Sequence, residues 1–212
     1  MLDDFEKHLD GVDRKVVALE RDGAEARSVI LSRAYATTVE DLWDAVTNKE
    51  RLPRWFAPVE GDLRPGGEYK VQGNAGGTIT ACEPPRSFSL TWEMMGDVSW
   101  VDVSIAAEGI DTARLTLTHT AKVSSHYDQY GPGATGVGWE LGLLGLALHM
   151  EDSSAEKVDE IAFAQSEGGK GFSRGSAERW GDAAIAAGED ADVARASATR
   201  TAAFFTGEAD PS

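Results

Sequence analysis

Alternation of apolar and polar residues predicts that the chain begins with two β-strands. Residues 14–20 are rich in Val and Leu, and residues 26–36 carry Val29, Leu31 and Tyr35 on one face. Between these runs lies Asp22-Gly23, a dipeptide that turns a hairpin readily. The pattern therefore predicts a β-hairpin. Thr38 and then Asn48, with Pro53 following, predict two short helices after it.

The sequence pattern changes over residues 60–120, where short runs of alternating apolar and polar residues are separated by clusters of Gly, Pro and Asp. This is typical of an antiparallel meander. Within each run the large residues share one face. They are Tyr69 and Val71; Phe88, Leu90 and Trp92; Val101, Val103 and Ile105; and Leu115 and Leu117 with His119. Because only one face of this sheet is apolar, another element must cover it.

Residues 136–149 are too apolar for a surface helix and predict a buried helix that covers the sheet. Gly138, Gly142 and Gly145 recur along it, and each costs about 1 kcal/mol relative to alanine. This row of glycines, which we call the glycine stripe, must have a benefit that offsets its cost to the helix. Either the helix approaches the sheet closely, or space is left for a ligand.

After Met150 the sequence is Ala-rich and acidic. A capping box over residues 153–156 predicts a helix through Ile161. A glycine-rich joint is predicted at 168–175, followed by helices at 176–187 and 192–205, the last stopped by Gly207. We therefore predict an α+β protein with a domain at 1–149 and an acidic helical extension at 150–212.

Composition excludes several classes of function. Twenty basic against 36 acidic residues give a formal charge of −16, which argues against a nucleic-acid partner and against an anionic membrane surface. No apolar run is long enough for a signal peptide or for membrane insertion, so a cytoplasmic protein is expected. Cys82 is the single cysteine, and the four histidines are scattered, so neither a disulfide, a metal site nor a cofactor is predicted.

Two strings match catalytic motifs, but their surroundings do not fit. Residues 171–175 spell G-x-S-x-G without the buried strand that a nucleophile elbow requires. Residues 131–136 spell G-x-G-x-x-G, but a polar segment precedes them in place of a strand. We interpret the first as a joint and the second as the lead-in to the covering helix.

The candidate site residues are aromatic and apolar side chains with one histidine among them. They are Trp55, Phe56, Tyr69, Trp92, His119, Trp139 and Leu143. Core packing is the default explanation for each, but their convergence also suits the wall of a small-molecule site. His119, on the covered face, would be a natural polar anchor there and is the one weak catalytic candidate.

These elements and motifs together resemble the START-related SRPBCC superfamily, which has the birch-allergen-like helix-grip fold, and in it the bacterial branch similar to Aha-type activators of the heat-shock chaperone ATPase. The residues that carry the resemblance are Leu52-Pro53-Arg54-Trp55-Phe56, Arg64-Pro65-Gly66-Gly67, Glu83-Pro84-Pro85 and Leu90-Thr91-Trp92. It covers about residues 26–149. The resemblance implies a curved antiparallel sheet that grips a long helix around a hydrophobic cavity.

The resemblance does not imply one function, because the fold hosts lipid carriers, hormone receptors and polyketide cyclases. We expect binding of a small apolar or amphipathic molecule in the cavity, without covalent chemistry. One alternative is a cofactor-free cyclase or dehydratase that uses His119 as general acid or base, although Glu93 and Asp102 fall on the opposite face from Trp92. Another is a chaperone-related or homodimeric interaction module that docks through the C-terminal extension.

Overall fold

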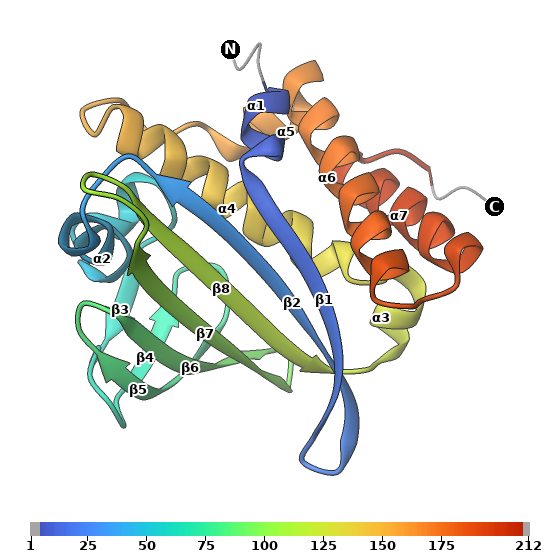
Figure 1. The fold of residues 1–212 in the computed structure, drawn as a ribbon, viewed down its shortest axis with the longest axis horizontal. Coiled ribbons are helices and arrows are strands. Elements are labelled where there is room, and N and C mark those ends of the chain that lie inside the picture. The colour runs from blue at the N-terminus through green and yellow to red at the C-terminus, as the bar shows by residue number, and fades with distance from the viewer. Residues whose placement is uncertain (1–4, 210–212) are drawn as a thin grey trace. The chain divides into compact units, whose positions relative to one another are not determined.

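The structure is a computed structural model that describes residues 5–209 (Figure 1). The strands are β1 (Val12–Arg21), β2 (Ala24–Tyr35), β3 (Val59–Gly61), β4 (Glu68–Val71), β5 (Gly76–Glu83), β6 (Ser87–Met94), β7 (Asp97–Ala107) and β8 (Ala113–Lys122). The helices are α1 (Phe5–Asp10), α2 (Val39–Thr47), η1 (Leu52–Arg54), α3 (Ser125–Tyr130), α4 (Gly133–Glu151), α5 (Glu160–Gln165), α6 (Glu167–Ala186) and α7 (Ala191–Thr206).

The sheet has the strand order β1-β2-β8-β7-β6-β5-β4-β3. Strands β3 to β8 pair antiparallel, as the predicted meander requires. The predicted α+β class with the helix-grip fold is confirmed. The chain divides into two compact units. Unit 1 comprises residues 1–31, 122–141 and 158–212, and unit 2 comprises residues 32–121 and 142–157. The predicted division at residue 149 stays a prediction.

Local sequence signals account for the first elements. Asp22 and Gly23 both adopt positive φ, at 51° and 74°, as the hairpin between β1 and β2 demands. The Thr38 hydroxyl accepts a hydrogen bond from the Asp41 backbone N–H and caps α2. Pro53 lies in the short η1 helix, and Gly207 ends α7 in the left-handed conformation.

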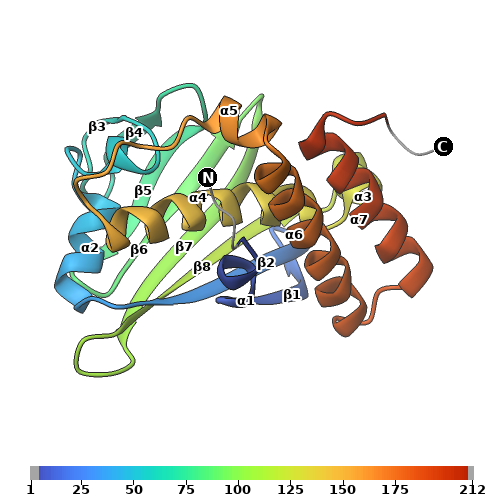
Figure 2. The same cartoon turned by 90° about the horizontal axis from the view of Figure 1, so that it is seen from above.

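Unit 1 has a helical core in which Trp180, Phe172, Leu9 and Val137 are buried. Helices α6 and α7 lie side by side in both views (Figures 1 and 2). A Cβ built on Gly136 would lie 2.2 Å from the Trp180 ring, so only glycine allows α4 to pack on this indole. The unit also buries an ion pair that the sequence did not indicate, since Arg14 Nε lies 2.6 Å from Glu140 Oε1.

The C-terminal predictions need two corrections. Residues 153–156 do not begin a helix, because the N-cap is Asp159, whose side chain accepts from the backbone N–H groups of Ile161 and Ala162. The predicted joint at 168–175 is helical and belongs to α6. A Cβ on Gly171 or Gly175 would meet Phe5 or Leu9 of α1 at 2.8 and 2.7 Å. These glycines therefore serve close helix packing, and tertiary contacts outweigh their low helix propensity.

The glycine stripe of α4 does not serve a single purpose. Cβ atoms built on Gly138 and Gly142 would meet nothing within 4 Å, whereas one on Gly145 would lie 2.6 Å from the Trp55 carbonyl oxygen. Close approach therefore explains Gly145, and the partner is the backbone after η1, not the sheet.

Candidate functional site: the apolar face of strand β6

The site lies in unit 2 and begins with three residues of β6 on one face of the sheet. Phe88, Leu90 and Trp92 are all half-buried. Their neighbours across the strand pair are Val103, Val101 and Ser99 of β7, in that order. Val101 and Val103 are buried, so the cover over this face is less complete at β6 than at β7. The predicted face of Phe88, Leu90 and Trp92 is confirmed by this register.

The two ends of this face have different surroundings. At one end the ring of Trp43 in α2 meets the ring of Phe88 edge-on, with centroids 5.9 Å apart. At the other end Trp92 packs with Phe56 against a buried cluster of Tyr69, Val71 and Ile79. The structure therefore brings together three of the predicted site residues, Phe56, Tyr69 and Trp92.

His119 joins the same face from β8, where its register partner is Val101. Its Nε2 lies 2.8 Å from Ser99 Oγ, and the Ser99 hydroxyl donates to the Trp92 carbonyl oxygen at 3.0 Å. Because the only proton of that hydroxyl is used, Ser99 accepts from His119, and the imidazole carries its proton on Nε2. The Trp92 and His119 rings meet edge-on with centroids 6.3 Å apart.

Burial fixes the charge of this histidine. His119 is 8% exposed, and desolvation lowers its pKa from 6.5 to about 4. It is therefore a neutral imidazole at neutral pH. Together, His119 and Ser99 form an uncharged polar pair beside the apolar face of β6.

The two carboxylates considered as helpers for His119 lie elsewhere. Glu93 and Asp102 are exposed, and the register places them on the opposite face of the sheet from Trp92 and Val101. Asp102 accepts a hydrogen bond from Ser89, and Glu93 accepts one from Thr91. Neither orients the imidazole.

The remaining predicted residues are placed as follows. The Trp55 ring lies against that of Phe56, with centroids 5.5 Å apart, and its Nε1 donates to the Ala45 carbonyl at 2.9 Å. Leu143 is buried, and its carbonyl accepts from Tyr35. Trp139 is half-buried and belongs to unit 1. That Leu143 and Trp139 line the same site stays a prediction.

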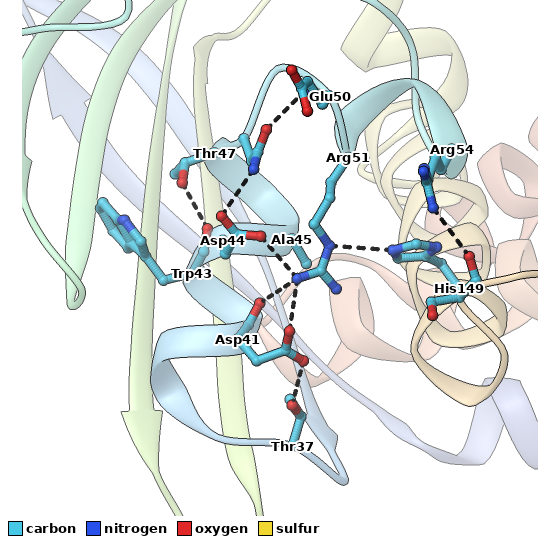
Figure 3. Close-up of polar contacts among 12 residues, drawn as sticks. Thr37, Asp41, Trp43, Asp44, Ala45, Thr47, Glu50, Arg51, Arg54 and His149 are labelled. Carbon is cyan, nitrogen blue, oxygen red and sulfur yellow. Dashed lines mark hydrogen bonds and ion pairs between the residues drawn. The ribbon is translucent and has the colours of Figure 1, made fainter.

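A polar cluster that the sequence did not indicate joins Arg51, just before η1, to α2 and α4 (Figure 3). The Arg51 guanidinium donates to Asp41 Oδ1 at 2.7 Å and to Asp44 Oδ2 at 3.0 Å, and its Nε donates to His149 Nε2 at 3.4 Å. A hydrogen bond from Thr37 is the main reason that the pKa of Asp41 is lowered. Burial, and then the charge of Arg51, lowers the pKa of His149, so this imidazole can accept.

Ser99 was also missed, because a serine within an apolar strand gives no local signal of its role. Only the register of β7 with β6 and β8 places it between Trp92 and His119. Within residues 5–209, no group of three or more His, Cys, Asp or Glu residues is arranged to hold a metal ion. None of the helices in the same range is both long enough and apolar enough to cross a membrane.

Comparison with known proteins places this fold in a family. The sequence model described as "Activator of Hsp90 ATPase homolog 1-like protein" matches residues 36–151, more than half of the chain. The comparison with curated proteins gave no match.

Solved structures extend the match. The crystal structure of CalU16 from Micromonospora echinospora is 30% identical and covers 82% of this chain and 98% of its own, with a TM-score of 0.66. The solution structure of CalU16, also 30% identical, covers 83% of this chain and 96% of its own, with a TM-score of 0.69. EF2215 from Enterococcus faecalis, a conserved protein of unknown function, is 14% identical and covers 84% of this chain and 95% of its own. Its TM-score of 0.60 shows that it shares the fold. The chain therefore belongs to the Activator of Hsp90 ATPase homolog 1-like family.

Proposed function

We propose that unit 2 binds a small apolar or amphipathic molecule against the face formed by Leu90 and Trp92, without covalent chemistry. The observation that carries this proposal is that Trp92 is only half-buried although it adjoins the buried His119. Small-molecule sites combine apolar and aromatic walls with a few fixed polar groups. A half-covered aromatic face beside one polar pair has this composition.

The polar pair indicates which ligand group it would bind. The Ser99 hydroxyl uses its proton on the Trp92 carbonyl and one lone pair on His119, which leaves one lone pair as an acceptor. A ligand hydroxyl or N–H group is therefore the best polar match. Since His119 is neutral, the pair supplies no charge for a carboxylate or a phosphate.

Binding at this face can be measured with the uncharged dye N-phenyl-1-naphthylamine, which carries one N–H group and whose fluorescence rises in apolar surroundings. We expect Trp92→Ala to raise the Kd of the dye about tenfold. The apolar surface of a half-exposed indole contributes on the order of 1 to 2 kcal/mol to the free energy of binding when a ligand covers it. Trp100→Ala is the matched control. Trp100 is also half-buried, but its register partner is Thr91, so it lies on the opposite face. Equal losses in both variants would refute the proposal.

The natural ligand can be sought by native mass spectrometry of protein purified from its own host, before and after denaturation. A small molecule that is lost on denaturation, and that Trp92→Ala fails to retain, would support binding at this face.

An enzyme is the second candidate, because His119 is a buried imidazole beside an apolar face. His119→Gln keeps a donor and an acceptor but cannot transfer protons. A general acid or base role predicts that kcat falls about 10² to 10⁴-fold on any cyclisable or dehydratable substrate that binds, with binding retained. The anchor role that we propose predicts binding without turnover in the wild-type protein.

A further inference from the structure

The hairpin that joins β6 to β7 exposes large apolar side chains at its tip. Met94, Met95 and Val98 are 47%, 97% and 46% exposed. Glu93, which precedes them, and Asp97, which lies between Met95 and Val98, are exposed as well. We call these five residues the hairpin tip. Single exposed apolar residues are ordinary on protein surfaces, but three within five positions on one turn are not scattered.

The turn itself does not favour methionine. Met95 and Gly96 adopt φ values of 55° and 91°, the pattern of a two-residue hairpin turn in which Asn, Asp or Gly is preferred at the first position. The hairpin between β1 and β2 follows this preference with Asp22-Gly23 at 51° and 74°. Met95 therefore carries the strain of a positive φ while it buries almost none of its side chain. The stability of the fold does not explain this residue.

Charge indicates the kind of partner. Residues 87–113 contain five acidic residues and no Lys, Arg or His. Glu93 and Asp97, the two at the tip, lie within two positions of an exposed methionine. A complementary surface must therefore supply both apolar groups and positive charges. Unbranched, polarizable methionine side chains adapt to varied apolar partners.

We propose that the hairpin tip is a docking surface for a basic amphipathic segment of another protein. The segment would lie across the end of the hairpin, over the exposed Met95. From there its apolar and basic residues would reach Met94 and Asp97 on one face of the hairpin and Val98 and Glu93 on the other. A second copy of this chain that docked through the same tip would bring the same negative charges to the contact, and an anionic membrane would repel them. The inference does not depend on the proposed ligand site.

The test uses a fluorescently labelled amphipathic peptide of leucine and lysine, titrated with the full chain at 150 mM salt. We expect Met94→Ser/Met95→Asn to raise the Kd at least tenfold. Asn adopts positive φ readily, so this variant keeps the turn. Ile110→Ser is the matched control because Ile110 is 96% exposed and lies between Glu108 and Asp111 on another loop. It should change the Kd less than twofold.

Two further variants complete the design. Glu93→Gln/Asp97→Asn should weaken binding and flatten its dependence on salt. Because Met94 shares the sheet face of Trp92, Trp92→Ala is included and should leave the peptide Kd within twofold, which separates this proposal from the ligand site.

Several results would overturn the inference. They are no binding of the labelled peptide with up to 100 µM wild-type chain, equal losses in the methionine and Ile110 variants, or equal binding of a peptide with glutamate in place of lysine. Concentration-dependent dimerisation in sedimentation that the methionine variant abolishes would assign the tip to a second copy. Binding to anionic phospholipid vesicles that the methionine variant abolishes would assign it to a membrane.

Discussion

His119 couples the candidate site to pH. Burial lowers its pKa from 6.5 to about 4, so the folded protein binds fewer protons than the unfolded chain between these values. The free energy of unfolding should therefore fall as pH falls from about 6.5 toward 4, by at most about 3 kcal/mol from this residue. Urea unfolding at pH 7 and pH 4.5 measures the loss, and His119→Gln should reduce it. If both proteins lost the same stability, His119 would not be the buried neutral group described above.

The buried ion pair of Glu140 with Arg14 should contribute strongly to stability. Its side chain is 0% exposed and that of Arg14 is 8% exposed, so Glu140→Gln leaves a buried guanidinium without its counter-charge. We expect a loss of about 3 to 5 kcal/mol in the free energy of unfolding. Asp62→Asn is the control, because the side chains of Arg64 and Asp62 are 77% and 53% exposed, and it should cost less than about 1 kcal/mol. Similar losses in the two variants would contradict the burial of the Arg14–Glu140 pair.

At the scale of elements, α4 offers an internal comparison between two of its glycines. Gly142→Ala adds a methyl group where nothing lies within 4 Å, so it should raise the free energy of unfolding by up to about 1 kcal/mol. Gly145→Ala places the same methyl group 2.6 Å from the Trp55 carbonyl oxygen and should lower it by about 1 to 3 kcal/mol. Thermal or urea unfolding of both variants checks the opposite signs. A stabilising Gly145→Ala would contradict the close approach of α4 to Trp55.

The elements also show where prediction from sequence succeeds. Strands β3 to β8, the cap at Thr38 and the turn at Gly23 follow from local patterns, because neighbouring residues determine them. The helical glycines of α6 do not, since their packing partners Phe5 and Leu9 lie more than 160 positions earlier in the chain. The same holds for the site. The face of Trp92 follows from the alternation of apolar and polar residues in β6. The position of Ser99 depends on the register of β6 with β7, and the hydrogen bond between Arg51 and His149 joins residues 98 positions apart.

Over the whole of residues 5–209, the C-terminal part contains one long exposed connection, between α4 and α5. Residues 152–159 are non-helical and exposed, whereas residues 168–175 lie within α6. A glutamate-specific protease should therefore cut after Glu156 well before it cuts after Glu178, which is exposed but helical. Mass spectrometry of the first fragments measures the order. Initial cleavage within α6 would show that its glycine-rich half is not a stable helix.

Binding of a small apolar molecule to the face of Trp92 should be visible in a single spectrum. The six tryptophans give six indole N–H signals in a proton–nitrogen correlation spectrum of the ¹⁵N-labelled protein. On titration with N-phenyl-1-naphthylamine, we expect the Trp92 signal to shift in a saturable way, while the signals of Trp100 on the opposite face and of the buried Trp180 stay in place. A saturable shift of Trp100 or Trp180 with an unmoved Trp92 would contradict it.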